Sequence, residues 1–205
     1  MQDGVAEAEL LLKAGRGDES AFLLLYERHR TPVFRFACRM LGSAQLAEDV
    51  TQECFLSILR RPDAFRAERA SLRTYMCAIV RHLALKQLRK RGQETVMDDP
   101  PDEPSAAVWS VPAESPLQTV MDDETASAVR RAVEALPPLQ REAVVLFEYQ
   151  EMSLADIAAV CDIDVGTVKS RLHRARERLR RTLAPYLAGG PGAAGAVVEG
   201  RETRS

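Results

Sequence analysis

Aromatic residues are scarce in this sequence. They make up 5% of the 205 residues, whereas Ala, Leu, Arg and Glu are abundant, a composition that favours helices over sheets. The chain also lacks turn-bounded runs in which apolar and polar residues alternate, the pattern typical of half-buried strands. We therefore expect an all-α fold.

Long apolar runs are missing as well. No stretch approaches the ~18–20 residues that a membrane-spanning helix needs. No basic segment precedes the short apolar stretch near the N-terminus, as a secretory signal would require. With 28% charged residues, the sequence predicts a soluble, cytoplasmic protein without membrane insertion.

Signatures of catalysis and of metal binding are absent. The four cysteines, Cys38, Cys54, Cys77 and Cys161, form no C-x-x-C pair, and the three histidines show no H-x-x-x-H spacing. No Gly-rich phosphate loop and no Ser/His/Asp or Cys/His set is suggested. We expect no enzyme activity, no cofactor and no metal. We interpret the cysteines as small buried hydrophobes, with a redox or metal role as the alternative.

Charge is distributed in blocks, although the formal net charge is only −2. Residues 60–91 carry ten basic and two acidic groups, and residues 164–181 carry seven basic and two acidic groups. Between them, residues 92–129 carry nine acidic groups and no basic one. Five prolines also fall in this acidic block, so we expect a linker over residues 92–121 that joins two small helical domains. The Gly- and Ala-rich residues 188–205 are predicted to be disordered.

The first domain is expected to span residues 18–91, with residues 1–17 as an N-terminal segment. Three helices with apolar residues at helical spacing are predicted to begin at the N-caps Asp18, Ser43 and Ser71. Gly42 and Gly92 are expected to end the first and the last of them. The domain is therefore predicted to be a helical bundle.

The second domain is expected to span residues 122–187. A helix in "ETASAVRRAVEAL" should break at Pro137, and "LQREAVVLFEYQ" should form the next helix. Ser153 and Asp156 have the spacing of a capping box, and the short turn "CDID" leads into a basic helix that starts near Val165. Two helices joined by a brief turn predict a helix-turn-helix.

The basic helix has two distinct sides on a helical wheel. Its apolar stripe consists of Val165, Val168, Leu172, Ala175 and Leu179. The opposite side holds Gly166, Ser170, His173 and Arg174, with Lys169 and Arg176 along one flank and Arg171 and Arg178 along the other. This layout suits a DNA major groove, and the backbone N–H groups of Gly166 and Thr167 could bind a phosphate. A solvated arginine-rich helix is the alternative.

Two stretches of the chain resemble a known family. The segment "LPPLQREAVVLFEYQEMSLADIAAVCDIDVGTVKSRLHRAR" (136–176) resembles region four of bacterial sigma-70 factors, especially the extracytoplasmic function (ECF) group. "EDVTQECFLSILRR" (48–61) resembles region two of the same family. The resemblance implies that Asp49, Gln52, Glu53 and Phe55 bind the β′ clamp of core RNA polymerase. It also implies that the second domain contacts the polymerase β flap.

The resemblance also implies two DNA-binding surfaces. For the −35 element, base contacts would come from Lys169, Ser170, His173 and Arg174, and further contacts, mainly to phosphates, from Gly166, Thr167, Arg171 and Arg178. The stretch "AFRAERASLRTYMCAIVRHLALKQLRKR" resembles the part of region two that melts and binds the −10 element. The residues implied there are Phe65, Arg66, Arg73, Tyr75, Arg81, His82, Lys86 and Arg89.

Two residues depart from the family pattern, since His82 stands where Asn is usual and Lys86 where Asp or Asn is frequent. Both departures leave the preferred −10 sequence open. Tyr75 is as compatible with a core position as with base stacking.

The function implied by the resemblance is promoter-specific initiation of transcription by a subunit of RNA polymerase. The expected partners are core RNA polymerase and promoter DNA, and an anti-sigma factor is a further candidate partner. The alternative is a helix-turn-helix regulator that binds duplex DNA without polymerase.

Overall fold

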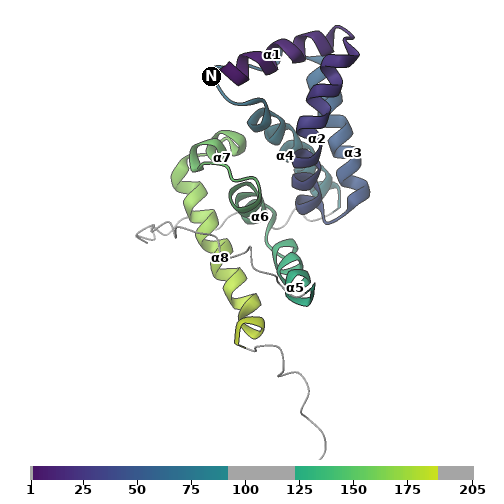
Figure 1. Cartoon of the computed structure of the whole chain (residues 1–205). Coiled ribbons are helices and arrows are strands. Elements are labelled where there is room, and N and C mark those ends of the chain that lie inside the picture. The colour runs from purple at the N-terminus through teal and green to yellow at the C-terminus, as the bar shows by residue number, and fades with distance from the viewer. Residues whose placement is uncertain (1, 92–122, 189–205) are drawn as a thin grey trace, which may run out of the picture.

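The structure, a computed structural model, describes residues 2–91 and 123–188 (Figure 1). These two stretches are helical and contain no strand, which confirms the all-α expectation for the described part of the chain. The predicted acidic linker and all but the first residue of the predicted tail lie outside the described residues. In the described part, no helix is both long and apolar enough to cross a membrane.

Residues 2–91 form the first helical unit. Its elements are α1 (Gln2–Gly15), α2 (Glu19–Leu41), α3 (Ala44–Arg60), the short 3₁₀ helix η1 (Pro62–Ala64) and α4 (Leu72–Lys90). The predicted N-caps are confirmed, because the side chains of Asp18, Ser43 and Ser71 each accept a hydrogen bond from the backbone N–H three residues further on. Gly42 ends α2 with a φ of 63°, a left-handed conformation that favours glycine. The local signals therefore predicted these helix boundaries correctly.

Helix α1 was not expected from the sequence, which left residues 1–17 as a segment without an element. Leu11 is fully buried in the core, and α1 packs against α2 and α3. A Cβ atom on Gly15 would lie 2.8 Å from the Pro62 side chain, so the absence of a side chain there permits the close approach of η1. Tertiary contacts of this kind stabilise a helix that has no clear cap in its own sequence.

Residues 123–188 form the second helical unit. Its elements are α5 (Asp123–Glu134), α6 (Pro138–Val144), the π-helical turn η3 (Val145–Tyr149), α7 (Leu154–Cys161) and α8 (Val165–Ala188). The expected helix after Pro137 is present, but its second half is wound as a π-helix. A π-turn adds a residue to the turn and so changes the direction of the side chains that follow it.

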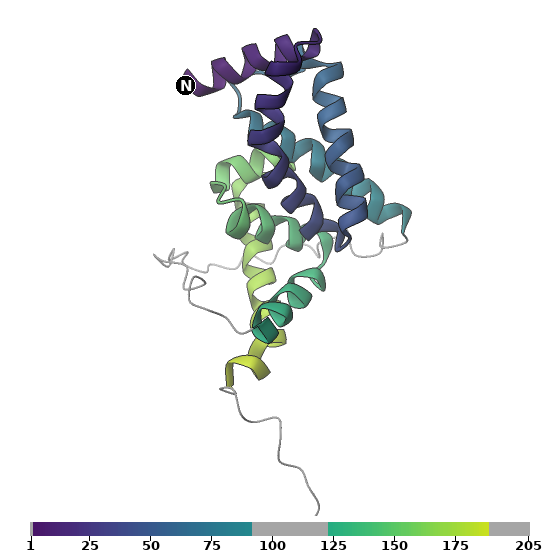
Figure 2. The ribbon, with the colours of Figure 1, turned by 45° about the vertical axis from the view of Figure 1, so that its right-hand side comes forward.

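The two units pack directly on each other (Figures 1 and 2). Helix α7 contacts α4, and α2 contacts α5, α6 and η3. Helix α8 packs on the side of α6 and α7 that faces away from α2 and α3 (Figure 1). Buried side chains from both units belong to one hydrophobic cluster. The sequence did not predict this contact.

Candidate nucleic-acid interface and polymerase-binding face

The turn between α7 and α8 is built by capping side chains. Asp156 N–H donates to Ser153 Oγ at 3.1 Å, and Ser153 Oγ donates to Asp156 Oδ2 at 2.6 Å, which confirms the predicted pairing. Asp162 adopts a left-handed conformation with a φ of 55° and ends α7. These local bonds fix the direction in which α8 leaves α7.

Asp164 holds the first turn of α8. Its carboxylate accepts the Thr167 N–H at 2.9 Å and the Thr167 hydroxyl at 2.6 Å. The hydrogen bonds from Thr167 lower the pKa of Asp164. A Cβ atom on Gly166 would lie 2.8 Å from Asp164 Oδ1, so glycine allows the cap to close. Both donor groups of Thr167 are therefore bound to Asp164, whereas the family resemblance implied a contact of Thr167 with a DNA phosphate.

The apolar stripe of α8 lies against the second unit, largely as predicted. Val168, Leu172 and Ala175 are fully buried and Leu179 is half-buried, but Val165 is 38% exposed. On the other side of the helix, Gly166, Lys169, His173 and Arg178 are exposed, and Ser170 and Arg174 are half-buried. The exposed side thus contains most of the residues expected to contact the −35 element.

Arg171 differs from this expectation. Its side chain is buried and donates from Nη1 to Glu142 Oε1 at 3.0 Å, whereas the wheel put it on an outward flank. The reason is helical spacing, because Arg171 follows Val168 by three residues and precedes Ala175 by four. It therefore borders the apolar stripe, where a buried carboxylate on α6 binds it.

The residues expected to bind polymerase lie on α3. Asp49 and Gln52 are exposed, and Glu53 forms an exposed ion pair with Arg60 at 3.1 Å. Phe55 is only 4% exposed and packs edge-on against the Phe22 ring with centroids 6.3 Å apart. Phe55 therefore packs beneath the acidic face, as we call the surface of Asp49, Gln52 and Glu53. Its ring is not accessible to a partner in this structure.

The residues expected to bind the −10 element divide into three groups. Arg66, His82, Lys86 and Arg89 are exposed. Phe65 is buried and Tyr75 half-buried, with ring centroids 5.7 Å apart. Arg73 and Arg81 instead bind Gln150 and Glu142 of the second unit. The structure thus gathers an exposed cationic surface on and before α4, and it buries one of the two aromatic candidates.

Three buried polar residues, Glu142, Arg141 and Gln150, were not among the residues predicted from the sequence. Arg141 Nη1 donates to Met40 O at 2.6 Å, and burial lowers the pKa of its guanidinium. The sequence does contain one indication of the burial of Glu142. Glu142 follows Leu139 by three residues, so a charged side chain lies on the apolar face of the predicted helix. A partner for it was invisible in the sequence, because Arg81 lies 61 residues away.

The cysteines agree with the simpler interpretation. Cys54, Cys77 and Cys161 are buried and Cys38 is half-buried. Burial raises the pKa of each of the three buried thiols to about 12, so they are protonated at neutral pH. Among the described residues, no group of three or more His, Cys, Asp or Glu side chains could hold a metal ion.

Comparison with known families matches both units. The model of sigma-70 region 2 matches residues 25–94, and the model of sigma-70 region 4 matches residues 126–179. The first match covers the helices that carry the acidic face and the α4 cations. The second covers the helix-turn-helix.

Individual relatives agree with these matches. The RNA polymerase sigma-H factor of Pseudomonas aeruginosa is 32% identical over 88% of this chain and 95% of its own length. The ECF RNA polymerase sigma factor SigM of Mycobacterium tuberculosis is 37% identical over 87% of this chain and 85% of its own length.

A solved structure has a similar fold. The sigma factor RpoE of Bartonella quintana, in complex with the anti-sigma factor NepR, superposes with a TM-score of 0.57. It is 29% identical and covers 81% of this chain and 96% of that chain. This chain therefore belongs to the sigma-70 family of bacterial RNA polymerase sigma factors, within its extracytoplasmic function group.

Proposed function

We propose that this chain binds core RNA polymerase and directs it to specific promoters. The observation that carries the proposal is the presence, in one chain, of both sigma regions with an exposed acidic face on α3 and an exposed cationic face on α8. The chain acts as an initiation factor and not as an enzyme. Because bacterial RNA polymerase works in the cytoplasm, this function assigns the chain to that compartment.

Helix α8 reads the −35 element in the major groove. Lys169 and His173 are exposed on its outward side and reach base edges together with Ser170 and Arg174. Gly166 and Arg178 lie at the two ends of the same side and contact phosphates. Arg171 and Thr167 join them only after releasing Glu142 and Asp164.

Helix α4 and the residues before it bind the opened −10 element. Arg66, His82, Lys86 and Arg89 are exposed and supply positive charge or hydrogen-bond donors for single-strand binding. Tyr75 provides the accessible aromatic surface, supported from below by Phe65. Arg73 and Arg81 complete this surface when the second unit leaves it.

The α3 face binds the polymerase β′ clamp. Asp49, Gln52 and Glu53 lie at i, i+3 and i+4, so they form one acidic surface for basic residues of the clamp. The second unit contacts the β flap. Binding of the two units to two different parts of the polymerase sets the distance between the −10 and −35 binding surfaces. The two domains correspond to residues 18–91 and 122–187, joined by the acidic residues 92–121.

An anti-sigma factor is a further partner that we infer from similar proteins. The Bartonella quintana sigma factor was solved with an anti-sigma factor bound, and that protein shares the fold of this chain. Such a partner would compete with polymerase for one or both units.

Reconstituted transcription tests the proposed function. Core polymerase with this chain should transcribe specifically from members of a promoter library. Replacement of Asp49, Gln52 and Glu53 together by Ala should abolish transcription and co-purification with core, while the triple variant still binds duplex DNA. Lys169→Ala should reduce the difference in binding free energy between the correct and a wrong −35 base by about 1–3 kcal/mol per lost base contact. This variant should still co-purify with core polymerase.

A helix-turn-helix regulator would behave differently. It would bind duplex DNA without polymerase, and the triple variant on α3 would leave its activity intact. A purified chain that never associates with core polymerase would exclude the sigma-factor role.

A further inference from the structure

The contact between the two units contains a carboxylate shared by two arginines. Glu142 on α6 is fully buried, and its Oε2 accepts Arg81 Nε of α4 at 2.8 Å. Arg81 Nη2 reaches Oε1 at 3.3 Å, and Arg171 Nη1 of α8 donates to the same oxygen at 3.0 Å. One acidic side chain therefore joins a helix of the first unit to the DNA-reading helix of the second.

Burial raises the pKa of Glu142, and the positive charges of Arg81 and Arg171 offset this shift only in part. Burial alone would lower the pKa of Arg81, but the negative charge of Glu142 outweighs it and raises the pKa. The side chains of Arg81 and Arg171 are 20% and 10% exposed. The N–H groups that Arg81 and Arg171 donate to Glu142 are not available to a nucleic-acid phosphate at the same time.

A second arginine of α4 is also bound by the second unit, here through neutral oxygen atoms. Arg73 Nη2 donates to the backbone oxygen of Gln150 at 2.6 Å and to its Oε1 at 2.9 Å. Gln150 Nε2 in turn donates to Pro32 O of α2 at 3.3 Å. The second unit thus covers two of the arginines that the proposed function assigns to the −10 strand.

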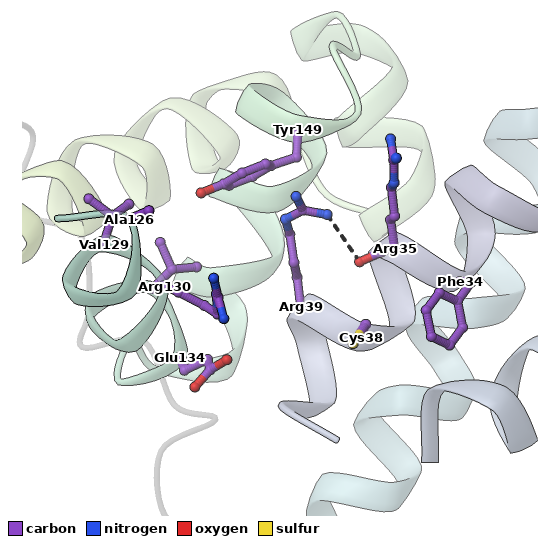
Figure 3. Close-up of a pocket in the computed structure, with 10 residues that line it drawn as sticks. Phe34, Arg35, Cys38, Arg39, Ala126, Val129, Arg130, Glu134 and Tyr149 are labelled. Atoms are coloured by element: carbon purple, nitrogen blue, oxygen red, sulfur yellow. Dashed lines mark hydrogen bonds between the residues drawn. The ribbon is translucent and has the colours of Figure 1, made fainter. Parts of the chain in front are cut away.

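The rest of the contact combines buried apolar side chains of both units with a cation–π pair and a pocket. Arg39 of α2 lies over the Tyr149 ring, 4.0 Å from its centroid (Figure 3). Beside this pair lies a pocket of about 530 Å³ between α2 and α5, lined by charged side chains such as Arg130 and Glu134 and by apolar ones such as Phe34 and Val129. Buried ion pairs contribute little net stability, because desolvation offsets their attraction. A phosphate, like a carboxylate, can bind a guanidinium through two parallel hydrogen bonds, so a DNA phosphate can take the place of Glu142 on these arginines.

We propose that this contact is an autoinhibitory latch in which Glu142 and Gln150 occupy the −10 strand-binding arginines of the free protein. We call Arg73, Arg81, Arg171, Glu142 and Gln150 the latch. Its opening releases Arg73 and Arg81 to single-stranded DNA and Arg171 to duplex DNA. The proposal rests on the proposed function for the identity of the ligand, but the latch itself can be tested without polymerase.

The test measures binding of a mixed-sequence single-stranded oligonucleotide to the full chain by fluorescence anisotropy over a range of salt concentrations. Small-angle X-ray scattering on the same samples gives the radius of gyration. Glu142→Gln and the double variant Tyr149→Ala/Gln150→Ala should both increase the radius. They should also bind the oligonucleotide more tightly, with a log–log salt slope steeper by about 0.7 for each recovered phosphate contact.

Two matched variants control for charge and for loss of an exposed ring. Glu177→Gln removes an acidic group of α8 that pairs with Arg180, outside the latch. Tyr186→Ala removes a tyrosine that is 44% exposed on α8, where Tyr149 is 38% exposed. Both should keep the radius and the affinity of the unaltered chain.

The outcomes are distinct. Latch variants that fold, as judged by circular dichroism and cooperative melting, but bind like the controls would overturn the proposal. A gain in Glu177→Gln equal to that in Glu142→Gln would also overturn it, because net charge would then explain the effect. If Glu142→Gln does not fold, the double variant decides. Failure to bind core polymerase would refute the proposed function and leave these measurements unaffected.

Discussion

His29 is a titratable side chain buried beside a carboxylate. Its Nε2–H donates to Glu7 Oε1 at 3.0 Å, and Arg28 binds the same oxygen at 3.1 Å. Burial lowers the pKa of His29 below its usual value of 6.5, although Glu7 opposes the shift. The imidazole is therefore neutral in the folded protein at pH 7.

This shift predicts how stability depends on pH. As the pH falls below about 6.5, the unfolded chain takes up a proton on His29 that the folded chain resists, so the free energy of unfolding decreases. Urea unfolding at pH 7.5 and pH 5.5 should show this loss, and His29→Gln should reduce it. His82→Gln, at an exposed position of α4, should retain the full loss. Equal pH dependence in all three proteins would contradict the assignment.

For single residues, the sequence predicted which side chains of α8 are exposed better than it predicted which other side chains they contact. Lys169 and His173 are exposed as expected, because their side of α8 follows from helical periodicity alone. Arg171 is buried because it borders the apolar stripe and binds Glu142 on another helix. Helical periodicity could not reveal this partner.

Helix α4 shows how one capping residue positions a functional element. Ser71 Oγ accepts the Thr74 N–H at 3.1 Å and lies 2.8 Å from the Thr74 hydroxyl. It thereby stabilises the first turn of the helix that carries the proposed −10 residues.

Ser71→Ala should therefore destabilise the protein by about 1 kcal/mol, because an N–H at the start of α4 loses its partner. Chemical denaturation with circular dichroism measures the change. Ser57→Ala, inside α3 and away from any cap, is the matched control and should change stability less. Equal losses in the two variants would show that the Ser71 cap contributes nothing specific.

Most helix boundaries were predictable at this scale, because the N-caps and the left-handed Gly42 are local features; Gly92, predicted to end α4, lies outside the described residues. Helix α1 and the π-turn η3 were not. The first is held by burial of Leu11 against other helices, and the second departs from the regular winding that periodicity assumes.

For the molecule as a whole, the reactivity of the Cys161 thiol reports on how tightly the two units are closed, because Cys161 lies beside Glu142 and Arg81. Cys54 and Cys77 lie in the first unit and Cys161 in the second, and the pKa of each thiol is raised to about 12. Cys161 also interacts with Glu142, so it lies at the latch.

Ellman's reagent at pH 7.5 should therefore modify Cys38 first in the folded chain, and the three buried thiols only as the protein opens. All four cysteines should react in concentrated urea. In Glu142→Gln, Cys161 should become reactive ahead of Cys54 and Cys77, as peptide mapping would reveal. Simultaneous modification of the buried thiols in that variant would indicate global unfolding instead.

The amino-acid sequence by itself determined the helical class, the caps, the helix-turn-helix and the family, because each depends on residues close together in the chain or on a motif within one segment. Only the tertiary structure decided that the two units pack on each other and that Glu142 binds Arg81 and Arg171. The physical reason is that a buried charge must find an opposite charge in space, and that partner can lie on any helix that folding brings beside it.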